Sequence, residues 1–130
     1  LEALASLADR PGKIAAAMDA SRKEVFLGLY EKSDNALQMQ GEELLTQQDF
    51  LATLGTERPA VIITGDAALA ELASSSHSSV VVVTPPGSEV IARIGARKLL
   101  AGDTVSVEAL DANYLRRSDA EIFFKGNRRA

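Results

Sequence analysis

The stretch KIAAAMDASRKEVFLGLYEK, residues 13–32, decides the fold of this chain. It predicts two strands, residues 13–19 and 24–31, joined by the polar turn 20–23. In the second strand Val25, Leu27 and Leu29 alternate with Phe26, Gly28 and Tyr30, so both phases are apolar. A strand that is apolar on both sides belongs in a sheet that is covered on both faces. We therefore expect this hairpin at the centre of the sheet.

A third strand is expected at residues 36–45, after the turn at residues 33–35. Here Leu37 and Met39 alternate with Gln38 and Gln40, and Gly41 indicates a bulge where the phase changes. Together with the hairpin, this strand makes an antiparallel meander.

From residue 46 onward, helices and apolar strands alternate. We expect a helix at 47–54, capped by Thr46 and ended by Gly55, and a second at 67–73, capped by Asp66. A third, capped by Ser88, is expected to run to about Ala101, before Gly102. Buried strands are expected at 60–64 and 80–84, both lying parallel beside the first strand. In the last helix, an apolar face is predicted to pack inward while Lys98 reaches toward solvent; its members are Val90, Ile91, Ile94 and Ala101.

This element order predicts an α/β fold of the ribonuclease H-like kind, with a mixed five-stranded sheet and helices on both faces. Residues 1–8 are helical by periodicity and open without a cap, which indicates a piece of a longer protein. We expect a remnant helix and linker at 1–10, the subdomain itself at 11–104 and a tail at 105–130.

Composition narrows the function. The chain has 130 residues, 46% of them hydrophobic and 25% charged, which is typical of a globular domain. No apolar run approaches the roughly 20 residues of a membrane helix. The absence of cysteine excludes disulfides and thiolate metal sites and fits a cytoplasmic protein. A net charge of −4 argues against a free-standing nucleic-acid binder, although residues 113–130 carry five basic residues against two acidic ones.

Candidate site residues are few. Asp19 ends the first strand, where a phosphate- or magnesium-handling acid can stand, but a carboxylate that bonds its own turn is the simpler interpretation. Gly65 and Asp66 lie where a strand meets a helix, although no GxxxxGK[ST] or GxGxxG pattern is present. His77 is the only histidine and stands in a serine-rich loop, so we expect neither a metal site nor a cofactor.

The tail contains Tyr114, Leu115 and Arg116, followed by Arg117. Two interpretations stay open. Tyr114 and Leu115 pack the tail onto the domain while the arginines pair with acidic surface, or these residues form a partner interface.

Four segments resemble the TsaB (YeaZ) family, the glycoprotease-like proteins of tRNA threonylcarbamoyladenosine synthesis. They are LEALASLA at residues 1–8, AMDASRKEVF at 17–26, Thr64-Gly65-Asp66, and Tyr114-Leu115-Arg116-Arg117 with acidic residues after it. The chain departs from the family pattern at Ala67, where a glycine is usual, and at Ser21, which precedes the arginine. The resemblance covers the C-terminal half of the family, and the glycine-rich N-terminal half is absent.

The resemblance implies a non-catalytic member of the actin-like ATPase superfamily. Such a protein is expected to be a cytoplasmic scaffold that binds and activates a TsaD-like threonylcarbamoyl transferase together with an ATPase partner, and that meets tRNA only indirectly. The contacts with TsaD are expected from the absent half. We also expect a weak homodimer built on Leu1, Leu4 and Leu7, on a surface bordered by Ala15 and Ala17.

Two other functions remain open. One is half of an actin-like-fold sugar or acyl kinase, in which Asp19 handles phosphate. The other is a glycoprotein-directed peptidase, which the shortage of metal-ligating side chains disfavours.

Overall fold

The computed structural model describes residues 1–76 and 78–116. These residues form five strands, four α-helices and one turn of 3-10 helix. In chain order they are α1 (Glu2–Ser6), β1 (Gly12–Asp19), β2 (Glu24–Lys32), β3 (Leu37–Thr46), α2 (Gln47–Glu57), β4 (Val61–Thr64), α3 (Ala67–Ala73), β5 (Ser79–Val82), α4 (Ser88–Leu100) and η1 (Val107–Ala109).

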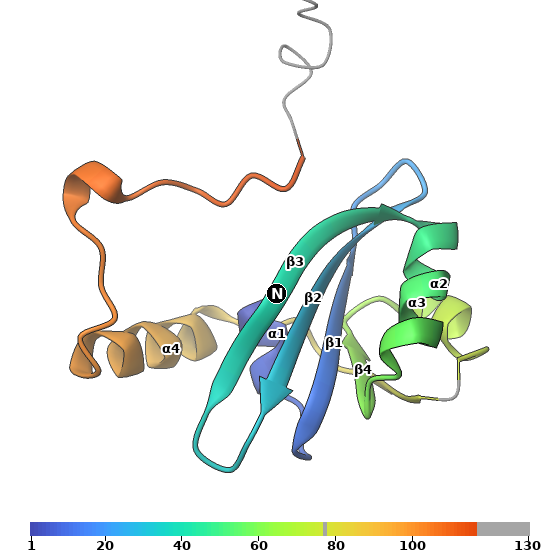
Figure 1. Cartoon of the computed structure of the whole chain (residues 1–130), viewed down its shortest axis with the longest axis horizontal. Helices are drawn as coiled ribbons and strands as arrows, with labels where there is room; N and C mark the ends of the chain where they lie inside the picture. The colour runs from blue at the N-terminus through green and yellow to red at the C-terminus, as the bar shows by residue number, and fades with distance from the viewer. Residues whose placement is uncertain (77, 117–130) are drawn as a thin grey trace, which may run out of the picture.

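The strands form one mixed sheet in the order β3-β2-β1-β4-β5. Figure 1 shows the first four of them side by side. The β1–β2 and β2–β3 pairs are antiparallel, whereas β1–β4 and β4–β5 are parallel. This confirms the predicted mixed five-stranded sheet. One detail was wrong: β4 lies beside β1, but β5 lies beyond β4 at the edge, and its Val82 is 54% exposed.

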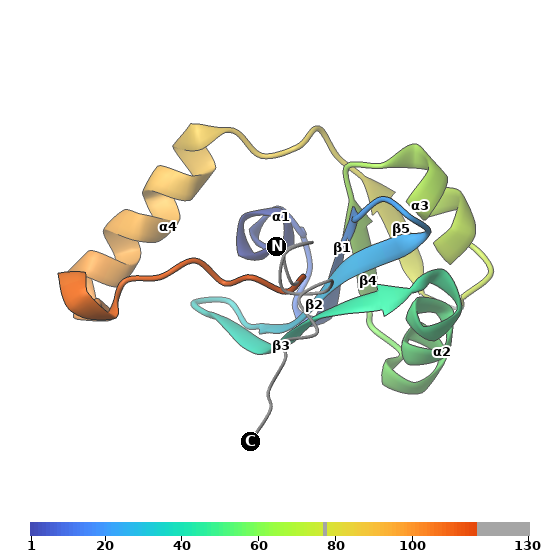
Figure 2. The same cartoon turned by 90° about the horizontal axis from the view of Figure 1, so that it is seen from above.

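The central strand β1 is buried on both faces. Ala15 and Ala17 belong to a cluster under α2 and α3, whereas Ile14 and Ala16 pack with α1 on the opposite face. Figure 2 shows α1 on one side of the sheet and α2 and α3 on the other. Covered faces explain the continuous apolar run in this strand. Ala15 and Ala17 are fully buried, so the expectation that they border an exposed surface was wrong.

The turn between β1 and β2 is left-handed. Ser21, Arg22 and Lys23 have φ angles of 61°, 53° and 59°, although none is a glycine. Each such residue costs roughly 1–2 kcal/mol. The hairpin nevertheless keeps an unbroken register from Gly12 opposite Lys32 to the end of β1. Burial of the two strands therefore sets the register against the preference of the turn residues.

The third strand contains the predicted bulge. Leu29 of β2 pairs with Gly41, and the next residue, Tyr30, pairs with Met39, so Gln40 has no opposite partner. A bulge of this kind adds a residue and reverses the phase of the strand. The phase change expected at Gly41 is confirmed.

The helix ends confirm some expectations and correct others. Thr46 Oγ1 accepts the backbone N–H of Asp49 at 3.1 Å, as a cap of α2 should. The helix does not stop at Gly55 but continues to Glu57 and ends at Arg58, whose φ is 45°. The cap of α4 was also wrong, because Gly87 holds that position and Ser88 is already inside the helix.

The helix α4 does not pack as its sequence suggests. None of its residues is buried, and Ile91 is 60% exposed. Figure 2 shows α4 standing apart from the sheet at the end of a long connection. Its Lys98 forms an ion pair with Glu2 of α1, with Nζ 2.7 Å from the carboxylate oxygen. The predicted inward apolar face is therefore wrong for this helix. Within residues 1–76 and 78–116, no helix is long and apolar enough to cross a membrane.

Candidate functional site

The sheet brings Asp19 and Asp66 together at the carboxyl ends of β1 and β4. Ala17 of β1 pairs with Thr64 of β4 in parallel, so the carboxyl ends of both strands lie side by side. Both aspartates line a cavity of about 410 Å³. The other lining residues come from β1, the turn after β4, α1 and its N-cap, the segment that joins β5 to α4, and α4 itself; they include Met18, Gly65, Leu1, Leu4, Pro85, Pro86 and Ile91.

Each carboxylate in this cavity already bonds the backbone beside it. Asp66 Oδ1 accepts the N–H of Leu69 at 3.0 Å and so caps α3. Asp19 Oδ1 accepts the N–H of Ser21 at 3.2 Å and so supports the left-handed turn. These bonds explain both aspartates as structural residues at the ends of their strands.

The residues next to the aspartates fit closely. Thr64 is fully buried, and its hydroxyl accepts the N–H of Asp66 at 3.1 Å. A Cβ atom at Gly65 would lie 3.0 Å from the ring of Pro85. A side chain at this position would therefore crowd Pro85, on the segment between β5 and α4. Among the residues that the structure places, no group of three or more acidic or histidine side chains could hold a metal ion.

The end of the described chain lies against β2. Arg116 forms an ion pair with Glu24, and its guanidinium lies 5.9 Å from the centroid of the Phe26 ring. Leu115 is half-buried, but Tyr114 is 80% exposed, so the expectation that Tyr114 docks onto the domain was wrong. These residues line a second cavity, of about 400 Å³, with Leu1, Met18, Phe26, Glu42 and Asn113. A partner role for Tyr114 stays a prediction. Arg117 and His77 lie outside the described residues.

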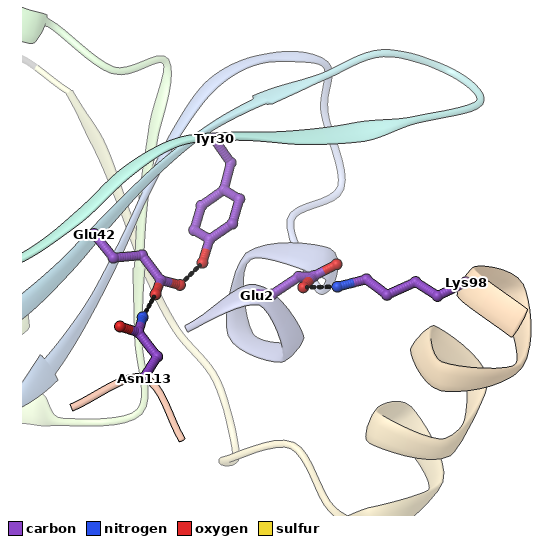
Figure 3. A network of polar contacts seen from close by, with 5 residues as sticks. All are labelled: Glu2, Tyr30, Glu42, Lys98 and Asn113. Carbon is purple, nitrogen blue, oxygen red and sulfur yellow. Dashed lines mark hydrogen bonds and ion pairs between the residues drawn. The ribbon is translucent and has the colours of Figure 1, made fainter. Parts of the chain in front are cut away.

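A polar network that was not predicted from the sequence joins the tail to β2 and β3 (Figure 3). The Tyr30 hydroxyl donates to Glu42 Oε1 at 2.5 Å, and Asn113 Nδ2 donates to Glu42 Oε2 at 2.6 Å. Burial, and then the neighbouring Glu42 carboxylate, raise the pKa of Tyr30 well above its ordinary value. The apolar pattern of β2 hid this polar role of Tyr30, and Asn113 is 71 residues from Glu42 in the chain.

The fold is that of YeaZ-like proteins. One solved structure, of an uncharacterized protein with similarity to peptidase YeaZ from Pseudomonas aeruginosa, matches with a TM-score of 0.66 and 19% sequence identity, over 89% of this chain and 55% of the other. YeaZ from Pseudomonas aeruginosa matches with a TM-score of 0.59 and 18% identity, over 79% of this chain and 50% of the other.

This similarity confirms the resemblance to YeaZ at the level of the fold. The chain spans about half the length of these two structures. No family model matches the sequence, and neither does any curated protein.

Proposed function

We propose that this chain is the C-terminal, ribonuclease H-like half of a TsaB-like scaffold protein of the actin-like ATPase superfamily. The observation that carries the proposal is the match of 89% of the chain to about half of a YeaZ-like structure. The short sequence motifs at the β1–β2 hairpin and at Thr64-Gly65-Asp66 support it, because both lie at the carboxyl ends of the adjacent strands β1 and β4.

In this proposal the whole protein binds and activates a TsaD-like threonylcarbamoyl transferase, together with an ATPase partner, in the modification of tRNA. It works in the cytoplasm, reaches tRNA only through its partners and performs no chemistry of its own. The local bonds of Asp19 and Asp66 support a non-catalytic role, since both carboxylates serve the backbone. The transferase is contacted by the half of the YeaZ-like fold that this chain does not match.

A hybrid protein tests this proposal. The matched half of Pseudomonas aeruginosa YeaZ is replaced by this chain, and the hybrid is added to a reconstituted system that makes threonylcarbamoyladenosine in tRNA. We expect activity above that of YeaZ truncated to its unmatched half. We also expect this chain alone not to capture purified TsaD in a pull-down. A folded hybrid without activity would contradict the proposal, and capture at micromolar affinity that Arg116→Ala abolishes would place the interface on the tail instead.

A second candidate is half of a sugar or acyl kinase. The observation in its favour is that Asp19 and Asp66 line one cavity at adjacent strand ends. Asp19→Asn in the hybrid separates the two functions, with Asp9→Asn, a change at an exposed carboxylate, as the control. The scaffold proposal expects near-normal tRNA modification in both variants. A loss of about a hundredfold with Asp19→Asn alone, in a folded protein, would favour the kinase, because removing one charge-stabilising group costs about that much.

A further inference from the structure

The edge strand β5 presents unpaired backbone groups. The N–H of Val83 donates to Thr64 O of β4 at 2.9 Å. Because backbone groups alternate in direction along a strand, those of Val81 also point toward β4, and those of Val80 and Val82 point outward. Within residues 1–76 and 78–116, no hydrogen bond is made to these outward groups. Such a row is a template for another strand.

The segment around β5 carries no charge that would oppose pairing. Residues 74–87 contain no Asp, Glu, Lys or Arg, and the strand itself reads Ser-Val-Val-Val. Val82 is 54% exposed although it is a large apolar side chain. Charged side chains and bulges are the usual protection of an edge strand, and β5 has neither. The other edge, β3, has both, with Glu42, Glu43 and the bulge at Gln40.

We propose that β5 pairs antiparallel with β5 of a second copy of this chain, across a two-fold axis. With Val81 opposite the partner's Val81, the outward groups of Val80 meet those of the partner's Val82. Both bonded pairs in this register are of the hydrogen-bonded antiparallel type. The exposed Val82 then packs beside the partner's Val80, on the face of the sheet that carries α3.

The charge pattern favours a second copy over the other edge of a neighbouring molecule. Pairing of β5 with a neighbour's β3 is heterologous and leads to open-ended filaments. It is opposed by the carboxylates and the bulge of β3. Pairing of β5 with itself closes after two copies and brings no charge of the strand against a like charge. The nearest charged side chain on α3, Glu71, is exposed to solvent.

The contact is small, because β5 has only four residues. Stable interfaces bury roughly 1,200 Å² or more, so this pairing is expected to be weak, with dissociation at high-micromolar concentration. The proposal places the homodimer at β5 and not at α1, where Leu4 is only 3% exposed and Leu7 is 37% exposed. It depends on the sheet edge and not on the function proposed above.

Sedimentation velocity of the 130-residue chain from micromolar to millimolar concentration tests the pairing. We expect a shift from monomer to dimer that is lost in Val82→Lys, since a lysine on the edge blocks strand addition. Val82→Pro should also abolish the dimer, because it removes an outward N–H without removing a bond to β4. The matched control is Met39→Lys on the other edge, at a side chain that is 62% exposed, and it should leave the dimer unchanged.

Amide hydrogen exchange identifies the surface. As protein concentration rises, exchange should slow at Val80 and Val82 but not at Val81. A chain that stays monomeric at millimolar concentration would overturn the proposal, as would a dimer that persists in Val82→Lys. Circular dichroism shows whether each variant is folded. If Val82→Pro does not fold, the result with Val82→Lys alone tests the proposal. Protection of Val80 and Val82 only when another protein is added would show that the edge receives a different partner, and would equally overturn pairing with a second copy.

Discussion

The two edges of this sheet are held in different ways. The strand β3 is ten residues long, pairs with β2 at every residue except Gln40 and is bonded to the tail through Glu42 and Asn113. The strand β5 has four residues, pairs with β4 and is supported by α3 on one face. The long edge carries carboxylates and a bulge, whereas the short edge is uncharged. The comparison shows that β3 is protected against pairing with another strand by its charged side chains, by its bulge and by its contact with the tail. The only such protection of β5 is its short length.

The largest effect is expected where the short edge meets the core. Leu69 of α3 is 4% exposed and belongs to the cluster against which Val80 packs. Leu69→Ala should lower the free energy of unfolding by about 2–5 kcal/mol, because it leaves a cavity. Denaturant unfolding measures the loss, with Leu100→Ala, at a side chain 88% exposed, as the matched control. Amide exchange should quicken more at β5 than at β3, and equal changes at the two strands would contradict the comparison.

The next effect concerns the long edge. Tyr30→Phe removes the hydroxyl that donates to Glu42, and should lower the free energy of unfolding by about 1–3 kcal/mol. The control is Tyr114→Phe, at an exposed ring, which should change it by less than about 0.5 kcal/mol.

Tyr30 also predicts a dependence on pH. Its pKa is raised in the folded state, so the folded protein keeps the hydroxyl protonated after the unfolded chain begins to ionise near pH 10. The stability that comes from this group is complete below that pH and is lost as the pH rises beyond it. Between pH 8 and 11 the free energy of unfolding should therefore fall more steeply with pH in the wild type than in Tyr30→Phe. Parallel curves would show that the hydroxyl of Tyr30 is accessible to solvent.

A smaller effect tests whether the helix caps contribute to the difference between the edges. Thr46 caps α2 after β3, and Asp66 caps α3 before β5. Thr46→Ala and Asp66→Ala should each cost about 1 kcal/mol in thermal or denaturant unfolding, because each leaves a backbone N–H unsatisfied. Thr46→Ser and Asp66→Asn keep an acceptor and serve as controls. If one cap cost several times more than the other, the caps would account for part of the asymmetry.

The smallest effect is expected at the tail. The ion pair of Arg116 with Glu24 is partly exposed, with 27% and 33% of the two side chains accessible. Partly exposed pairs contribute about 0.2–1 kcal/mol, and salt weakens them. A double-mutant cycle with Arg116→Ala and Glu24→Gln measures the coupling at low and high salt. A coupling above about 2 kcal/mol would show that the tail is a structural part of the β2–β3 edge.

Much of the fold followed from the sequence because burial imposes a pattern on residues that are neighbours in the chain. Both phases of β2 are apolar, and this placed the hairpin inside a sheet covered on both faces, as the clusters around Ala15 and Ala16 confirm. Hydrogen bonds between near neighbours in the chain could also be predicted: Thr46 and Asp66 cap the helices that follow them. Asp19 and Asp66 lie close together because they follow parallel neighbouring strands, although this proximity does not reveal a function.

The tertiary structure alone decided which apolar pattern was covered. The apolar residues of α4 repeat at helical spacing, yet Ile91 is exposed, because the connection after β5 carries this helix away from the sheet. The apolar run of β5 looks like that of β4, but β5 is at the edge of the sheet, since no further described strand pairs beyond it. The bond between Asn113 and Glu42 joins residues far apart in the chain, and no local pattern records it. Periodicity states what a segment can bury, and only the path of the whole chain determines whether anything arrives to cover it.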